Sequence, residues 1–425
     1  MARLVIKGRR RLKGEVRIGG SKNSSVAIIP AVLLGEGPST LENVPAIRDV
    51  KVFAQILQDL GALVSLNQNT MMISPNGFAS HVAPYGLVRK LRASYYLMGV
   101  LLAKFGKAKV GLPGGCDIGP RPIDQHLKGF RALGAEASVE GGVVRLYAQK
   151  LVGAPVYLDM PSVGATINIM LAACLAQGTT VIENAAKEPH VVDLANCLNS
   201  MGARIHGAGT DIIRIKGVKG LKSTCHSIIP DDMESATYMM MAAATGGDVE
   251  IQGVITKHLE PVVAKLKESG AFIEQNGDFI KVVGPDRPRP VNVKTLPYPG
   301  FPTDAQQPLT AVLTRATGVS VVQESMYDNR LGHVSELIKM GAKVRVQGKT
   351  AIVEGAPKLT GSPVIASDLR AGAGLVVAGL SAEGTTEIHG LEIIERGYES
   401  IVDKLKGLGA NVYRTDDQGQ ENSPV

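Results

Sequence analysis

The chain has few aromatic residues, no tryptophan and no long apolar run. Aromatic residues make up 4% of the sequence, which argues against a stacking platform for single-stranded nucleic acid. No uninterrupted apolar stretch approaches the roughly 18 residues that a membrane span needs. We therefore expect neither a nucleic-acid partner nor a membrane partner.

Cysteine is also scarce. The four cysteines, Cys116, Cys174, Cys197 and Cys225, lie far apart without a CxxC spacing. Such a distribution indicates free thiols in a reducing cytoplasmic compartment rather than a disulfide framework or a zinc site. The first residues carry no apolar segment ahead of their basic cluster, so we expect no signal peptide. The eight histidines are isolated and no GxGxxG motif occurs, so no metal or cofactor is expected.

What is abundant points to a large globular protein. The 425 residues are 44% hydrophobic and 20% charged, with a net charge of +7, and this length suits two to three domains. A residue-Gly-Ala triplet after an amphipathic helix occurs six times, with a period of about 70 residues. Its glycines, each expected at a helix C-terminus with a positive φ, are Gly61, Gly134, Gly202, Gly270, Gly341 and Gly409.

Each copy predicts the order strand–helix–strand–helix–strand–strand. Last strands are expected at 71–74, 143–147, 212–216, 279–283 and 350–354. The sixth copy lacks this strand, and residues 3–8 resemble the missing piece, so we expect the N-terminal strand to complete it. The prediction is an α/β protein of two domains, each with three βαβαββ units around a pseudo-three-fold axis. One domain would comprise residues 1–20 and 230–425, and the other residues 21–229, with a ligand cleft between them.

Residues that break the repeat are candidates for chemistry. The segment 111–124 contains four glycines and three prolines, which predicts a loop that carries Cys116. It is either a lid with a reactive thiol or a loop with an incidental cysteine. The segment 19–25, Gly-Gly-Ser-Lys-Asn-Ser-Ser, opens an apolar helix, where Lys22 could hold an anion. Other polar departures fall at expected helix starts and can equally be caps.

Nine of these segments together resemble the enolpyruvyl transferase family over nearly the whole chain. They are GGSKN at 19–23, LRAS at 91–94, LPGGCDIGPRPID at 112–124, PSVGAT at 161–166, IIPDDME at 228–234, FPTDAQQP at 301–308, DNR at 328–330, SDLRAG at 367–372 and IERGYE at 394–399. The cysteine loop favours the branch that acts on a nucleotide sugar over the branch that acts on shikimate 3-phosphate.

The resemblance implies that phosphoenolpyruvate and UDP-N-acetylglucosamine react by addition and then elimination of phosphate, at the start of peptidoglycan synthesis. It makes Cys116 the proton donor at C3 and a site of covalent adduct formation, and Asp304 the candidate base at the sugar 3-hydroxyl. Lys22, Arg121 and Arg396 match the cations for phosphoenolpyruvate. The matching contacts to the nucleotide sugar are Asn23, Arg92, Arg121, Pro122, Ile123, Asp124, Gln125, Ser162, Val163, Gly164 and Met326, the last through its backbone. Arg330, Asp368 and Arg370 match further positions near the substrates.

Two positions depart from the family pattern. Ile167 stands where an acidic residue is usual, and Ala305 stands where a larger apolar residue is common. Neither removes a group that the mechanism requires. Two alternatives stay open: a transferase for shikimate 3-phosphate, and a catalytically silent paralogue that binds the nucleotide sugar.

Overall fold

The computed structural model describes residues 2–112 and 122–415. These residues divide into two compact units. Unit 1 contains residues 2–19 and 230–415, and unit 2 contains residues 20–112 and 122–229. Each unit has its own hydrophobic core. Among the described residues, no helix has both the length and the apolar character to cross a membrane.

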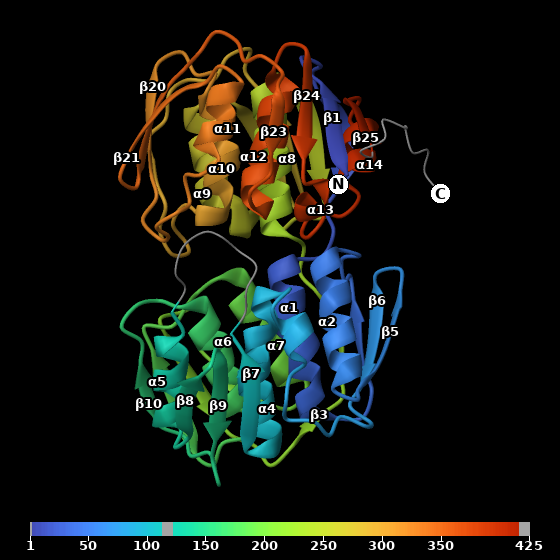
Figure 1. Cartoon of the computed structure of the whole chain (residues 1–425), viewed down its shortest axis with the longest axis vertical. Coiled ribbons are helices and arrows are strands. Elements are labelled where there is room, and N and C mark those ends of the chain that lie inside the picture. Colours follow the sequence, from blue (N-terminus) through green and yellow to red (C-terminus); the bar gives the residue numbers. More distant parts are fainter. Residues whose placement is uncertain (1, 113–121, 416–425) are drawn as a thin grey trace. The chain divides into compact units, whose positions relative to one another are not determined.

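Unit 2 contains three repeats (Figure 1). The first consists of β15 (Cys225–Ser227), α1 (Lys22–Ala31), β4 (Ser39–Glu42), α2 (Arg48–Asp59), β5 (Leu63–Asn67) and β6 (Thr70–Ser74). The second consists of α4 (Leu97–Phe105), β7 (Lys107–Gly111), α5 (Asp124–Ala132), β8 (Glu136–Glu140) and β9 (Val143–Tyr147). The third consists of β10 (Pro155–Tyr157), α6 (Val163–Ala173), β11 (Thr179–Glu183), α7 (Pro189–Ser200), β12 (Arg204–His206) and β13 (Ile212–Lys216).

Short elements fill the gaps between these repeats. They are the 3₁₀ turn η1 (Val32–Leu34), the strand pair β3 (Gly35–Glu36) and β14 (Leu221–Lys222), the helix α3 (Tyr85–Val88) and the 3₁₀ turn η2 (Arg92–Tyr96). In the second repeat a single bridge between Val82 and Lys109 takes the place of a first strand.

Unit 1 contains the other three repeats. The fourth consists of β2 (Lys13–Arg17), α8 (Asp232–Thr245), β16 (Asp248–Gln252), η3 (Thr256–Leu259), α9 (Glu260–Glu268), β17 (Phe272–Asn276) and β18 (Phe279–Val283). The fifth consists of β19 (Val293–Lys294), α10 (Thr303–Leu313), β20 (Val319–Gln323), α11 (Val334–Lys339), β21 (Lys343–Gln347) and β22 (Thr350–Glu354). The sixth consists of β23 (Pro363–Ile365), α12 (Leu369–Ser381), β24 (Thr385–His389), α13 (Leu391–Ile394), α14 (Ile401–Gly407), β25 (Asn411–Thr415) and β1 (Arg3–Lys7).

Among the described residues, five of the seven sheets have four strands in one common order. The first strand pairs in parallel with the second, the fourth pairs antiparallel with the second, and the third lies outside the fourth, as in β10-β11-β13-β12. The expected strands at 143–147, 212–216, 279–283 and 350–354 are confirmed to the residue. The six glycines of the repeated triplet all have positive φ, between +80° and +100°, so the turn prediction is also confirmed.

Chain segments distant in sequence complete three of the four-stranded sheets. β1 lies antiparallel to both β24 and β25, which confirms that the N-terminal strand finishes the sixth repeat, and β2 pairs in parallel with β16 of the fourth repeat. β15 pairs in parallel with β4, so the end of unit 2 supplies the first strand of its first repeat. Neither unit therefore closes from neighbouring sequence alone.

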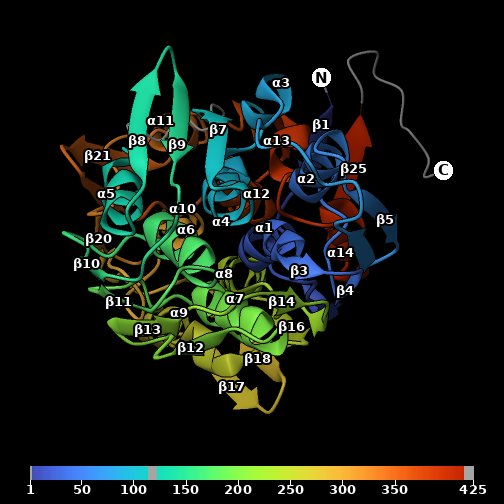
Figure 2. The ribbon, with the colours of Figure 1, turned by 90° about the horizontal axis from the view of Figure 1, so that it is seen from below.

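Apolar helices form the interior of each unit because they are hydrophobic on all sides. In unit 1, α8, α10 and α12 pack against one another. In unit 2, α4 packs against both α1 and α6, and Figure 2 shows the sheets placed around these helices. The first turns of these inner helices carry most of the polar residues singled out in the sequence.

Candidate functional site

The described residues include sixteen of the eighteen predicted site residues. Cys116 and Arg121 lie outside the described residues. The others fall into one group within unit 1 and another within unit 2.

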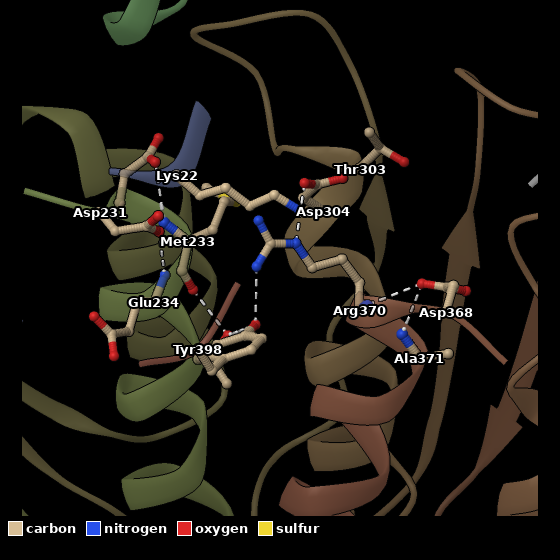
Figure 3. Close-up of polar contacts among 12 residues, drawn as sticks. Lys22, Asp231, Met233, Glu234, Thr303, Asp304, Asp368, Arg370, Ala371 and Tyr398 are labelled. Atoms are coloured by element: carbon tan, nitrogen blue, oxygen red, sulfur yellow. Dashed lines mark hydrogen bonds and ion pairs between the residues drawn. The ribbon is translucent and has the colours of Figure 1, made fainter. Parts of the chain in front are cut away.

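In unit 1, Asp304 lies in the first turn of α10 and faces the guanidinium groups of Arg330 and Arg370. Figure 3 shows the contact with Arg370. Its Oδ1 is 2.5 Å from Arg330 Nη2, and its Oδ2 is 3.0 Å from Arg370 Nε. The two arginine side chains are only 4% and 3% exposed, whereas the Asp304 side chain is 31% exposed. The carboxylate is thus the accessible member of a pre-formed ion-pair cluster.

Arg370 is held from its other side by Tyr398. Its Nη1 donates to the Tyr398 hydroxyl at 3.1 Å, and that hydroxyl is 2.8 Å from Thr237 Oγ1 on α8. Burial alone would lower the pKa of the Arg370 guanidinium. The oxygens of Tyr398, Asp304 and Asp231 outweigh burial and raise that pKa, so Arg370 stays charged.

Carboxylates also begin the two other inner helices of unit 1. Asp368 caps α12 and accepts bonds from the backbone N–H groups of Arg370 and Ala371. Asp231 caps α8 through the N–H of Glu234. Burial and the charge of Asp231 raise the pKa of the neighbouring Asp232 to about 7. The capping role considered for these residues is therefore confirmed for Asp368 and Asp231.

Three further predicted residues of unit 1 lie near loops. The N–H of Met326 donates to Glu324 Oε1 at 2.7 Å, so this backbone donor is already in use. Arg330 stacks over the Tyr327 ring, with its guanidinium carbon 5.6 Å from the ring centroid. Arg396 lies between α13 and α14 and is partly exposed.

In unit 2, Lys22 and Asn23 form the first residues of α1, which Ser21 caps through the N–H of Ser24. Lys22 Nζ is 2.8 Å from Asp49 Oδ2 in the first turn of α2, and the two side chains are 13% and 4% exposed. A buried carboxylate therefore holds the ammonium in place.

A second cluster in unit 2 gathers the starts of α5 and α6 with η2. The Arg92 guanidinium carbon is 5.7 Å from the Tyr95 ring centroid, and the Tyr95 ring meets the His126 ring edge-to-face at 5.0 Å. A Cβ at Gly164 would come within 2.8 Å of both the Tyr95 hydroxyl and the His126 ring. Glycine at 164 is thus required by this close packing.

Burial and the charge of Arg92 lower the pKa of His126 to about 3, against a smaller opposing effect of Asp124. The imidazole is therefore neutral. Asn168 Nδ2 lies 3.0 Å from His126 Nδ1, which assigns the acceptor role to Nδ1 and the proton to Nε2.

The remaining predicted residues of unit 2 lie beside this cluster. Ser162 caps α6 through the N–H of Ala165, and Val163 and Gly164 form its first turn. Asp124 and Gln125 begin α5, directly after Pro122 and Ile123. The side-chain amide of Gln125 is held by Asp159 at both ends. Its NH₂ group donates to Asp159 Oδ2, and its oxygen accepts from the Asp159 N–H.

Neither group contains a metal site within the described residues, since no three of their His, Cys, Asp or Glu side chains gather to hold an ion. Burial raises the pKa of Cys174 and of Cys197 to about 12, so these free thiols stay protonated. Cys225 is exposed.

The sequence alone assigned no role to Asp49, His126 or Tyr398. Asp49 and Tyr398 hold the predicted residues Lys22 and Arg370, and His126 packs closely against the predicted residue Gly164. Tyr398 does lie inside the motif at 394–399, two residues after the expected cation Arg396. That position was the one feature of the sequence that could have indicated a role for Tyr398.

Comparison with known proteins shows the family to which this chain belongs. A family model described as EPSP synthase (3-phosphoshikimate 1-carboxyvinyltransferase) matches residues 6–405. A protein named UDP-N-acetylglucosamine 1-carboxyvinyltransferase 2 from Bacillus cereus is 55% identical over 99% of this chain and 98% of its own length. The chain belongs to the enolpyruvyl transferase family. A further member of that name, from Geobacillus kaustophilus, is 53% identical over 97% of both chains.

Solved structures agree with this family assignment. The enolpyruvyl transferase NikO from Streptomyces tendae matches with a TM-score of 0.88 and 26% identity, over 97% of this chain and 99% of that one. EPSP synthase from Acinetobacter baumannii has a TM-score of 0.76 at 20% identity, over 98% of this chain and 100% of that one, and shows the same fold. The prediction of a two-domain enolpyruvyl transferase fold is confirmed.

Proposed function

We propose that this enolpyruvyl transferase moves the enolpyruvyl group of phosphoenolpyruvate to the 3-hydroxyl of UDP-N-acetylglucosamine and releases phosphate. The observation that carries the proposal is 53–55% identity, over nearly the full chain, to relatives named UDP-N-acetylglucosamine 1-carboxyvinyltransferase. The reaction would begin peptidoglycan synthesis in the cytoplasm.

The chemistry needs a base for the sugar hydroxyl, an acid for C3 and cations for the phosphate and carboxylate. Asp304 suits the first task, because its carboxylate is the exposed member of a cluster whose guanidiniums are buried. The hydroxyl oxygen attacks C2 while Asp304 takes the hydroxyl proton and C3 gains a proton. The resulting tetrahedral ketal then loses phosphate from C2 and a proton from C3, which restores the enol double bond. Cys116 is the proposed donor at C3.

The charged parts of both substrates need positive groups. Lys22, Arg121 and Arg396 are the proposed contacts for phosphoenolpyruvate. The start of α6 suits the diphosphate, because Val163 and Gly164 belong to a first turn without acidic residues, at the positive end of the helix dipole. Arg92 and the neutral His126 lie beside that turn.

Phosphate release with each acceptor tests the proposal. We expect turnover with UDP-N-acetylglucosamine and none with shikimate 3-phosphate. Turnover with shikimate 3-phosphate alone would instead assign the chain to the branch that acts on shikimate 3-phosphate. The matching family model is named after that branch. Binding of the nucleotide sugar without any product would identify a silent paralogue.

A phosphonate epoxide that resembles phosphoenolpyruvate tests the thiol. Intact-protein and peptide mass spectrometry should find one adduct, on Cys116. Cys174 and Cys197 are buried with raised pKa and should stay unmodified, and a Cys225→Ser variant controls for the exposed thiol. Cys116→Asp should retain turnover and resist the epoxide, because a carboxylic acid can also donate a proton. An inactive Cys116→Asp enzyme would mean that the sulfur does more than donate a proton.

A further inference from the structure

Glu324 is a buried carboxylate that none of the steps above uses. It follows β20 directly and is 1% exposed. Its two carboxyl oxygens accept hydrogen bonds from four donors. Burying a carboxylate without such partners would be costly, so a fully bonded one that sits close to a functional cluster calls for an explanation.

The four donors come from three separate segments. Oε1 accepts from the Thr295 hydroxyl at 2.9 Å and from the N–H groups of Met326 at 2.7 Å and Tyr327 at 3.3 Å. Oε2 accepts from the Thr303 hydroxyl at 2.9 Å. One side chain thus ties the start of α10 to the turn at residues 326–327.

The segments joined by Glu324 carry the two ends of one ion pair. Thr303 is the residue directly before Asp304. Tyr327 supplies the ring on which the Arg330 guanidinium lies, and Arg330 pairs with Asp304 at 2.5 Å. Movement of either segment would shift the Asp304 carboxylate against its guanidinium partner.

We propose that Glu324 is a positioning residue for the acceptor substrate, which acts by fixing Asp304 and the turn at Met326 and Tyr327 in one geometry. The proposal rests on the function proposed above, in which Asp304 takes the proton of the sugar hydroxyl, and on the backbone contact to the nucleotide sugar that the resemblance implies for Met326. Small displacements of reacting groups can lower rates by roughly a hundredfold. Loss of the tie should therefore affect the acceptor and leave phosphoenolpyruvate binding unchanged.

Thr303→Val tests this with little change of shape, because it removes only the hydroxyl that reaches Oε2. We expect the KM for UDP-N-acetylglucosamine to rise by roughly tenfold or more, with the KM for phosphoenolpyruvate within about twofold of wild type. Thr303→Ser keeps the donor and should restore wild-type values. Glu324→Gln should also stay near wild type, because its amide oxygen can accept at the Oε1 position and its NH₂ can donate to the Thr303 hydroxyl.

Thr386→Val is the matched control. Thr386 is buried in the same unit, and its hydroxyl has no hydrogen-bond partner within the described structure. The proposal is overturned if Thr303→Val has wild-type constants, if Thr303→Ser fails to rescue, or if Thr386→Val causes the same loss.

Assays of the wild-type enzyme test the proposed function independently of these variants. If wild type turns over only shikimate 3-phosphate, that acceptor replaces the nucleotide sugar in the same series. If wild type binds the nucleotide sugar without product, calorimetric Kd values replace KM. In either case an unchanged acceptor constant for Thr303→Val overturns the role of Glu324.

Discussion

The two units share one scaffold but start their inner helices with opposite chemistry. In unit 1, α8, α10 and α12 begin with Asp231, Asp304 and Asp368 as cap or first-turn residues. In unit 2, α1, α4 and α6 have no acidic residue in their first turns. Carboxylates at helix starts neutralise the helix dipole, whereas bare N–H groups leave it available to anions.

This contrast indicates that equivalent helix starts in the two units have different roles. Unit 1 uses its carboxylates to hold buried arginines, so its charges are arranged before substrate arrives. Unit 2 keeps hydroxyl caps, Lys22 and a neutral His126 around helix starts. A repeat can thus preserve packing and vary function by changing one turn of each helix.

Removal of the central carboxylate of unit 1 should have the largest effect. Asp304→Asn keeps the shape but removes the charge that faces Arg330 and Arg370. If Asp304 takes the proton of the acceptor hydroxyl, kcat should fall by roughly 10²- to 10⁴-fold in steady-state assays. Asp286→Asn, in the exposed pair with Arg11, is the matched control and should change nothing. Wild-type kcat for Asp304→Asn would remove this carboxylate from the chemistry.

The corresponding change in unit 2 should act on the other substrate. Asp49→Asn weakens the partner that holds the Lys22 ammonium, so kcat/KM for phosphoenolpyruvate should fall by roughly tenfold. The KM for the acceptor should stay constant. Asp59→Asn, on the same helix but exposed, serves as the control. An equal loss in both variants would contradict a specific role for Asp49.

Each unit also buries one neutral histidine, and this predicts a pH dependence of stability. Burial lowers the pKa of His126 to about 3 and that of His333 to about 4, while an unfolded histidine titrates near 6.5. Below pH 6.5 the unfolded chain binds protons that the folded chain does not. Stability therefore falls on acidification, by up to about 2 kcal/mol per histidine at pH 5.

Urea unfolding at pH 7 and pH 5 measures this loss. His126→Gln and His333→Gln should each reduce the difference between the two pH values. His206→Gln, at an exposed position, should leave the difference as in wild type. If all three variants match wild type, the loss on acidification arises from other groups.

The smallest expected effect concerns the caps, which should work alike in both units. Ser162→Ala and Asp368→Ala each remove side-chain acceptors at a helix start and should cost about 0.5–2 kcal/mol in unfolding experiments. Asp368→Asn should restore most of the loss, because an amide oxygen also caps. If Asp368→Asn is as damaging as Asp368→Ala, charge rather than capping matters at this position.

The sequence predicted the repeat well because its signals are local. Alternating apolar residues defined strands such as 143–147, and a glycine with positive φ marked the end of one helix in each repeat. The β1 strand was found by comparing copies. Partners such as Tyr398 for Arg370 or Asp49 for Lys22 were not predicted, because these contacts join separate helices or loops and leave no periodic trace.

Strand β1 makes the order of synthesis matter. It is translated long before its partners β24 and β25, which belong to the sixth repeat. Strand β2 likewise waits for β16. The described strands of unit 2 are all present once residue 229 has left the ribosome, whereas β1 of unit 1 stays unpaired until β24 has been made. This arrangement predicts that the middle of the chain matures ahead of both ends.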